Sequence, residues 1–350
     1  MIMSFRKLLI NFSLLLSVVF FCLVIMEIGL RLIYGNPHVF YSPQVRHIVT
    51  DYGYKPEPNQ IDSFTLNKTV RTNSSGFRDT EEWSLSKSND DYRIIVVGDS
   101  FTFGNGVEGK QRFTDLLKKS FKKGNKPIEI FNASAGGWNL KDELGFIYTE
   151  GLNYNPDMII MAFFINDWMD PPEPGEAIYS PSKGLTSGGR WDARPSWLKW
   201  LPYELIYKLK YSATVMYLRD RIALVGKSPD FNSKLLKDQI DLDDDQRISY
   251  SYDRIKELKN TLDQNNIDLV IAMIPPVNFF WLSDGNPQYI NHFQRFSKNN
   301  NITFIDLSLN LKVGNTKNLY YMYPWDNHLN EEGHKKVAEQ LEFELKHLIN

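Results

Sequence analysis

Short apolar runs alternate with segments of helical spacing along most of this chain. The apolar runs cover residues 93–97, 128–131, 158–164, 269–274 and 303–305. Segments in which apolar residues recur every three or four positions cover 113–123, 141–150, 252–264, 288–297 and 331–348. Apolar runs of this length are typical of strands buried on both faces of a sheet. Their alternation with amphipathic helices predicts an α/β fold, with a parallel sheet of about five strands between helices.

Residues 171–249 interrupt this alternation. The segment opens on Pro171-Pro172-Glu173-Pro174-Gly175, a strong breaker of regular structure. It also carries aromatic side chains that could stack on sugar rings or pack into a core: Trp197, Trp200, Tyr203 and Tyr207. We interpret the segment as a helical insertion after the third strand. Its apolar face would cover the active site, touch a membrane or pack on the domain, and the last is the simplest reading.

The N-terminus contains an uncharged apolar run, Leu8 to Met26, long enough to cross a bilayer as a helix. Arg6 and Lys7 precede it, which favours a cytoplasmic N-terminus and an exported remainder, although Arg31 weakens that orientation. A cleaved signal peptide is one alternative, but no small-x-small cleavage site follows the run. A buried core helix is another. We favour a retained signal anchor.

These patterns suggest four successive parts. Residues 1–7 form a cytoplasmic tail and residues 8–30 a transmembrane anchor. Residues 31–90, rich in proline and polar residues, form an irregular stalk. The α/β domain then spans 91–350 and includes the insertion at 171–249.

Composition narrows the class of protein. Hydrophobic residues make up 42% of the 350, which is ample for a packed core. A formal net charge of -2 gives no reason to expect nucleic-acid binding. The single cysteine, Cys22, excludes an intrachain disulfide, and the six scattered histidines do not suggest a metal site. We expect no cofactor and no metal.

The first predicted strand ends on Gly98-Asp99-Ser100. The three residues are common in turns, so the motif alone is ambiguous. However, in parallel α/β sheets, catalytic groups collect beyond the carboxyl ends of the strands. Ser100 is therefore a candidate nucleophile.

A serine hydroxyl needs an adjacent base, and a candidate lies just before the last helix. His328 has a suitable unperturbed pKa and would accept the Ser100 proton. Asp326 would accept the other ring N–H of His328 and stabilise the imidazolium. Each residue also has a structural explanation, since Asp326 could be a turn residue and His328 a surface one.

Two further segments follow the second and third predicted strands. They contain Gly136-Gly137 and Asn166-Asp167, which on their own could be a tight turn and a helix cap. The backbone N–H groups of Ser100 and Gly137 and the side-chain amide of Asn166 would together form an oxyanion hole. All four segments would meet at one edge of the sheet.

The set resembles the SGNH, or GDSL-type, serine hydrolases, whose four signature positions fall on Ser100, Gly137, Asn166 and His328. The resemblance implies a flavodoxin-like, three-layer α/β/α fold and an esterase, lipase, thioesterase or carbohydrate O-acyl esterase or transferase. Residues 71–79 also look like those of membrane-anchored bacterial members. One position departs from the pattern: many members have aspartate three residues before the histidine, where this chain has Trp325. Asp326, two residues before, resembles the spacing in alginate-acetylation proteins of the superfamily.

The sequence therefore predicts a membrane-anchored serine esterase that acts through an acyl-serine on an O-acyl ester, such as an acetylated envelope or exported carbohydrate. The catalytic domain would lie on the periplasmic or extracellular side of the cytoplasmic membrane. Two alternatives are an O-acyltransferase that modifies an extracellular polysaccharide and a non-catalytic binding or assembly component of the same fold. A phosphate-binding flavodoxin-like domain is set aside, because the sequence has no Gly-rich or Thr/Ser-rich phosphate loop with a basic partner.

Overall fold

The structure of the protein is a computed structural model. This structure describes residues 5–37, 44–88, 91–122, 127–179, 185, 200–202, 205, 208–224, 231–237, 239–277, 288–311 and 319–349. The chain divides into two compact units, one formed by residues 1–40 and 194–228 and the other by residues 41–193 and 229–350.

The larger unit is built on five parallel strands in the order β6-β5-β7-β8-β9. Their bounds are β5 Tyr92–Gly98, β6 Ile128–Ser134, β7 Met158–Phe163, β8 Asp268–Met273 and β9 Thr303–Asp306. Each strand coincides with a predicted one to within three residues at either end. The α/β prediction with a five-stranded parallel sheet is confirmed.

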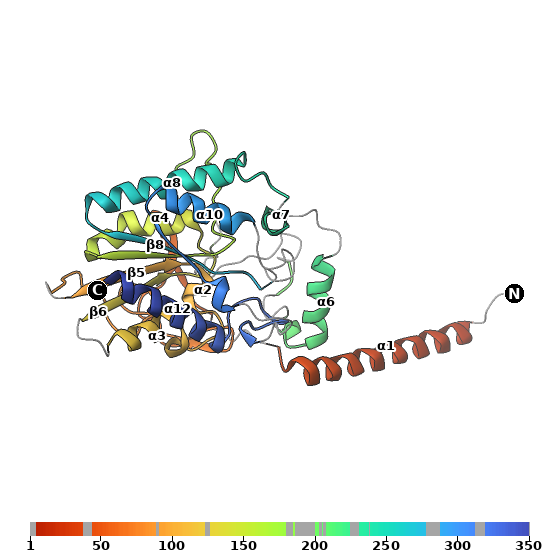
Figure 1. Cartoon of the computed structure of the whole chain (residues 1–350). Coiled ribbons are helices and arrows are strands. Elements are labelled where there is room, and N and C mark those ends of the chain that lie inside the picture. Colours follow the sequence, from red (N-terminus) through yellow and green to blue (C-terminus); the bar gives the residue numbers. More distant parts are fainter. Residues whose placement is uncertain are drawn as a thin grey trace. The chain divides into compact units, whose positions relative to one another are not determined.

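Helices cover both faces of the sheet, giving three layers (Figure 1). On one face lie α4 (Leu140–Thr149), α8 (Gln246–Gln264) and α10 (Gln288–Asn299). On the other lie α3 (Phe113–Phe121) and α12 (Glu331–Ile349). The shorter helices of the unit are α2 Ser100–Phe103, η1 Gly109–Gln111, η2 Gly151–Tyr154, α7 Phe231–Leu236 and α11 Ser308–Leu311.

Alternate side chains of β5 explain the two cores. Ile95 and Val97 pack into the core under α4, α8 and α10, whereas Ile94 and Val96 pack into the core under α3 and α12. All four are fully buried. A strand buried on both faces has no polar side to expose, which is why its sequence is a continuous apolar run.

Residues 44–88 are more ordered than the irregular stalk that we predicted from composition. They form two antiparallel hairpins, β1 (His47–Thr50) with β2 (Gly53–Pro56), and β3 (Ser63–Thr65) with β4 (Lys68–Val70). Tyr52, Tyr54, Phe77 and Trp83 from this segment belong to the core under α4. The sequence did not predict this packing, because these aromatic residues do not recur at a helical or strand spacing and lie among proline and polar residues.

The predicted insertion, 171–249, also ends earlier than expected. Helix α8 begins at Gln246, because the Asp245 side chain caps it by accepting the N–H groups of Arg247 and Ile248 at 2.9 and 3.1 Å. Of the four aromatics noted in the insertion, Trp200 is 76% exposed. Residues 197, 203 and 207 lie outside the described residues.

The smaller unit contains α1 (Phe5–Tyr34) and α6 (Ala213–Leu224). Residues Leu9–Tyr34 of α1 are long and apolar enough to cross a membrane, and an apolar 18-residue stretch among them has no residue buried within the protein. The helix has the composition of a membrane anchor or a signal sequence. Ala213 and Met216 of α6 are buried, whereas Val215 and Leu218 of the same helix are exposed.

Candidate active site

Ser100 lies at the start of the short helix α2, directly after β5. The side chain of Asp99 caps this helix by accepting the N–H of Phe101 at 2.8 Å. Gly98 allows the close approach of helix and strand, because a Cβ there would lie 2.3 Å from Thr102 Oγ1. The sharp turn from strand to helix places the Ser100 hydroxyl beyond the end of the sheet.

His328 lies in the turn that precedes α12. Its Nε2 atom is 2.7 Å from Ser100 Oγ, and its Nδ1 atom contacts Asp326 Oδ1. The ring of Phe101 packs against the imidazole, with 4.7 Å between the ring centroids. With its Nδ1 proton directed at Asp326, the imidazole presents the Nε2 lone pair to the serine hydroxyl.

The electrostatics of this pair favour a charged imidazole. Burial acts to lower the pKa of His328, but the carboxylates of Asp326 and Asp99 outweigh it, so its pKa is raised above 6.5. The same carboxylates would stabilise an imidazolium formed by the proton transfer that the sequence predicts from Ser100.

Gly137 and Asn166 follow the two strands that flank β5. Gly137 has a φ of 85°, in the left-handed region that favours glycine, and the Tyr54 hydroxyl donates to the preceding carbonyl of Gly136 at 2.8 Å. Asn166 is exposed and lies three residues after the end of β7, beyond the half-buried Phe164. The structure therefore places the sequence-predicted residues after the strands expected for them.

Asp167 fixes the loop that carries Asn166. Its buried carboxylate accepts the N–H of Phe164 at 2.5 Å, and its carbonyl accepts the N–H of Leu140 at 3.0 Å. The loop is thus tied both to its own strand and to the start of α4. This role was not evident from the sequence, in which Asn166-Asp167 could equally be a turn or a cap.

Asp99 connects the two sides of the site. Burial raises the pKa of this carboxyl, while hydrogen bonds from the Phe101 N–H, the Asn166 side chain and the Ser100 hydroxyl, together with charge on His328, act to lower it. Its Oδ2 atom is 3.4 Å from Ser100 Oγ, longer than the contact of that hydroxyl with His328. Asp99 therefore holds the nucleophile helix and the Asn166 amide in one arrangement.

Two more acidic side chains, besides that of Asp99, are buried in this part of the protein. Glu143 on α4 and Asp167 are both fully buried. Burial, followed by the negative charges of neighbouring carboxylates that include Asp99, raises the pKa of each well above its ordinary value. Sequence inspection did not single out Glu143, because a glutamate on an amphipathic helix is normally solvated. Within the described residues, no group of three or more His, Cys, Asp or Glu side chains is placed to hold a metal ion.

A family model for the GDSL-like lipase/acylhydrolase family matches residues 96–336, more than half of the chain. The chain belongs to this family. The match contains Ser100, Gly137, Asn166 and His328 and begins within β5. The GDSL-type prediction is confirmed, and the family identifies the chain as a hydrolase of the esterase and acylhydrolase class.

Solved structures of GDSL proteins resemble this GDSL-like hydrolase only distantly. TesA has 13% identity and a TM-score of 0.43, covering 73% of this chain and 99% of its own. Esterase EstA from Pseudoalteromonas sp. has 13% identity and a TM-score of 0.43, covering 74% and 100%. The acetyl xylan esterase AlAXEase has 17% identity and a TM-score of 0.42, covering 71% and 97%. A comparison with curated proteins found no match.

Proposed function

We propose that this GDSL-like hydrolase is a serine esterase in which Ser100 is the nucleophile, His328 the general base and Asp326 the residue that orients it. The observation that carries the proposal is the continuous contact from Asp326 through His328 to Ser100, with 2.7 Å between Nε2 and Oγ. That distance is within the range over which a base takes a proton from a nucleophile.

The proposed reaction proceeds through an acyl-serine. Ser100 Oγ attacks the ester carbonyl while His328 Nε2 takes its proton, and the C=O bond electrons move onto oxygen. The N–H groups of Ser100 and Gly137 and the Asn166 amide stabilise that oxyanion. Collapse of the tetrahedral intermediate breaks the ester C–O bond, and His328 gives its proton to the departing alcohol. Water, activated by His328, then attacks the acyl-serine and releases the acid.

The substrate that we propose is an O-acyl ester, most simply an O-acetyl ester, of an envelope or exported carbohydrate. The support is the N-terminal helix: Arg6 and Lys7 before it favour a cytoplasmic N-terminus, so the catalytic unit would face the outside of the cytoplasmic membrane. An enzyme held at that surface meets envelope polymers continuously. The proposed anchor is residues 8–30, which lie within α1, with residues 1–7 as the cytoplasmic tail.

The smaller unit contains a feature that suits this anchoring role. Glu27, in the last two turns of α1, accepts hydrogen bonds from the N–H groups of Ala213 and Thr214 at 3.0 and 2.8 Å and from the Ser212 hydroxyl at 2.8 Å. Arg31 pairs with the same carboxylate at 2.7 Å. A carboxylate near the end of an apolar helix is costly unless it is paired, and here a helix N-terminus and an arginine satisfy it.

The test of the nucleophile is Ser100→Ala in the full chain, purified in detergent. We expect the hydrolysis of p-nitrophenyl acetate to fall about 10⁴- to 10⁶-fold, because the triad acts as a unit. A fluorophosphonate probe should label wild-type Ser100, as identified by peptide mass spectrometry, and leave Ser100→Ala unlabelled. The exposed surface variant Ser249→Ala should retain both activity and labelling. Equal hydrolysis by wild type and Ser100→Ala would overturn the proposal.

Mass spectrometry of envelope glycans from cells with and without the protein distinguishes hydrolysis from transfer. An esterase removes acyl groups, so its loss should increase O-acetylation, and Ser100→Ala should reproduce that increase. Decreased O-acetylation would instead identify an O-acyltransferase, in which a sugar hydroxyl replaces water in the second step.

A further inference from the structure

A pocket of about 540 Å³ lies in the larger unit and is lined by none of the residues of the Ser100 site. Four cationic side chains line it: Arg71, Arg78, Lys110 and Arg112. Arg78 and Arg112 are almost completely buried, whereas Arg71 and Lys110 are exposed. The pocket therefore has positive charge both in its wall and at its rim.

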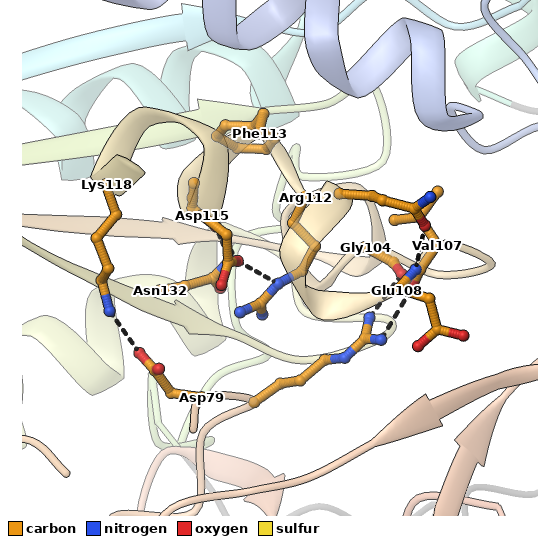
Figure 2. Close-up of polar contacts among 12 residues, drawn as sticks. Asp79, Gly104, Val107, Glu108, Arg112, Phe113, Asp115, Lys118 and Asn132 are labelled. Atoms are coloured by element: carbon orange, nitrogen blue, oxygen red, sulfur yellow. Dashed lines mark hydrogen bonds and ion pairs between the residues drawn. The ribbon is translucent and has the colours of Figure 1, made fainter. Parts of the chain in front are cut away.

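Arg112 has an unused donor in this wall. Its Nε donates to Asp115 Oδ2 at 2.7 Å, the contact drawn in Figure 2. Arg112 is only 2% exposed. Its buried Nη1 nevertheless has no hydrogen-bond partner among the described residues. Buried N–H groups of charged side chains are normally paired, so an unpaired one in a pocket wall indicates a place for an acceptor.

Arg78 adds a second positive charge, and its hydrogen bonds among the described residues go to backbone carbonyls and not to carboxylates. Its Nη1 donates to the carbonyls of Phe103 and Gly104 at 3.0 and 2.7 Å, and its Nη2 to those of Thr69 and Val107 at 2.9 and 2.8 Å. Carbonyl oxygens satisfy the donors but carry no full negative charge. Two of them belong to the C-terminal end of α2, the helix that starts at Ser100.

The neighbouring groups respond to this positive field. Burial and the nearby charge of Arg112 lower the pKa of Arg78 to about 9. Burial and the charges of Arg112 and Arg78 lower the pKa of His334 to about 3, so its imidazole is neutral and accepts the N–H of Phe113 at Nδ1. Both shifts agree with two positive charges close together at the pocket wall, which the charges of Asp115 and Glu108 offset only in part at Arg78.

Three carboxylates also line the pocket, and each already has a partner. Asp79 binds Lys118 at 3.2 Å, and Figure 2 shows this pair on the side of the pocket away from Glu108. Glu108 accepts the backbone N–H of Gln111 in a capping box. Asp115 is paired with Arg112 through Nε alone. None of these contacts uses Arg112 Nη1.

We propose that this pocket binds an oxyanion, a phosphate or carboxylate group, with Arg112 Nη1 as the buried donor and Lys110 and Arg71 as rim cations. The pocket is larger than one such group, so it has room for part of the molecule that carries it. This binding site is separate from the ester chemistry at Ser100 and does not depend on it.

The test is thermal unfolding of the full chain in detergent, titrated with sodium phosphate or sodium acetate against sodium chloride of equal ionic strength. A ligand that binds only the folded state stabilises it by RT ln(1 + [L]/Kd), so Tm keeps rising with the logarithm of ligand concentration above Kd. We expect such a rise with phosphate or with acetate that chloride does not give, and the more effective anion identifies the group. Equal effects of all three salts would overturn the proposal.

Variants locate the site. Arg112→Met should abolish the anion-dependent rise in Tm. Because Arg112 is buried, the double variant Arg71→Ala/Lys110→Ala provides a second measurement at exposed positions, and we expect it to weaken the apparent Kd about tenfold. Lys119→Ala/Lys298→Ala, which removes two exposed lysines elsewhere, should bind like wild type. If both double variants bind like wild type, or weaken equally, the pocket is not the anion site.

Discussion

The Asp326 carboxylate contacts His328 twice: Oδ1 accepts the backbone N–H of His328 at 2.9 Å and also contacts the ring Nδ1. An aspartate that accepts the N–H two residues ahead forms an Asx turn, which folds the chain back over its own side chain. In that turn the carboxylate and the imidazole necessarily lie side by side. A spacing of two residues can therefore serve the geometry that other members of the family reach with three, and Trp325 at the third position is buried instead.

Replacing Asp326 with Asn tests the proposed orienting role. The amide can still accept the backbone N–H, so the turn should persist, but it carries no charge to hold the Nδ1 proton. We expect kcat for p-nitrophenyl acetate to fall about 10³- to 10⁴-fold, as for a triad with its aspartate neutralised. The unfolding temperature should change little, which separates a chemical effect from a folding one. An unchanged kcat would exclude Asp326 from the mechanism.

The pH profile of kcat/KM should follow the raised pKa of His328. The imidazole must be neutral to accept the Ser100 proton, so activity should be low below that pKa and rise to a plateau above it. Because Asp326 contributes to raising the pKa above 6.5, Asp326→Asn should move the rise to lower pH while lowering the plateau. Initial rates between about pH 5 and 9 measure both quantities. A midpoint that stays in place, or moves to higher pH, would contradict the assignment.

The sequence predicted the sheet well because burial on both faces leaves a continuous apolar run that needs no partner to be recognised. The same logic could not find the hairpins at 47–70. The first hairpin packs on distant parts of the chain: β2 contacts α4, and the Tyr54 carbonyl accepts the Trp138 indole N–H at 2.7 Å. That hydrogen bond joins residues 84 positions apart, and the spacing of apolar residues along the chain cannot predict such a contact.

Some residues of the candidate site could be predicted from the sequence, and others could not. Ser100, Gly137 and Asn166 were singled out as candidates because each follows a predicted strand, and His328 because it precedes the last predicted helix. The supporting groups were missed, since Asp167 and Glu143 act through burial and backbone contacts that only the folded chain creates. The unpaired donor of Arg112 is another such feature.

Asn166 can be tested as an oxyanion donor. Removing one donor from an oxyanion hole typically costs about 10²- to 10³-fold in kcat, because it acts on charge that develops in the transition state. Asn166→Ala should lower kcat by that factor with little change in KM. Asn153→Ala, an exposed asparagine in η2, should match wild type. A rise in KM at constant kcat would instead assign Asn166 to substrate binding.

Glu143→Gln should make the protein more stable at neutral and alkaline pH. The folded-state pKa of Glu143 is raised well above 4.5, so above that pH the unfolded chain loses a proton that the folded chain keeps. The folded state then binds more protons, and stability falls with rising pH by up to about 1.4 kcal/mol per unit until the folded pKa is reached. Glutamine removes this dependence and preserves the shape of the side chain.

The measurement is the Tm of wild type and Glu143→Gln from about pH 5 to 8. We expect the two curves to diverge as pH rises, with the variant higher. Glu344→Gln makes the same chemical change on α12 and should follow wild type. Curves that stay parallel would show that Glu143 ionises normally in the folded protein.

Glu27 provides the last test, on the smaller unit. Its carboxylate accepts the N–H groups of Ala213 and Thr214, the first residues of α6, and so acts as a cap supplied by another helix. Loss of a cap typically costs about 1 kcal/mol, so in Glu27→Ala we expect the amides of residues 213 and 214 to exchange with deuterium about fivefold faster. Glu27→Gln, which keeps an acceptor but loses the charge, should give an intermediate rate because the helix dipole favours the carboxylate. Exchange in the α10 amides should be unchanged in both variants. Equal protection in all three proteins would mean that α6 is held to its unit without Glu27.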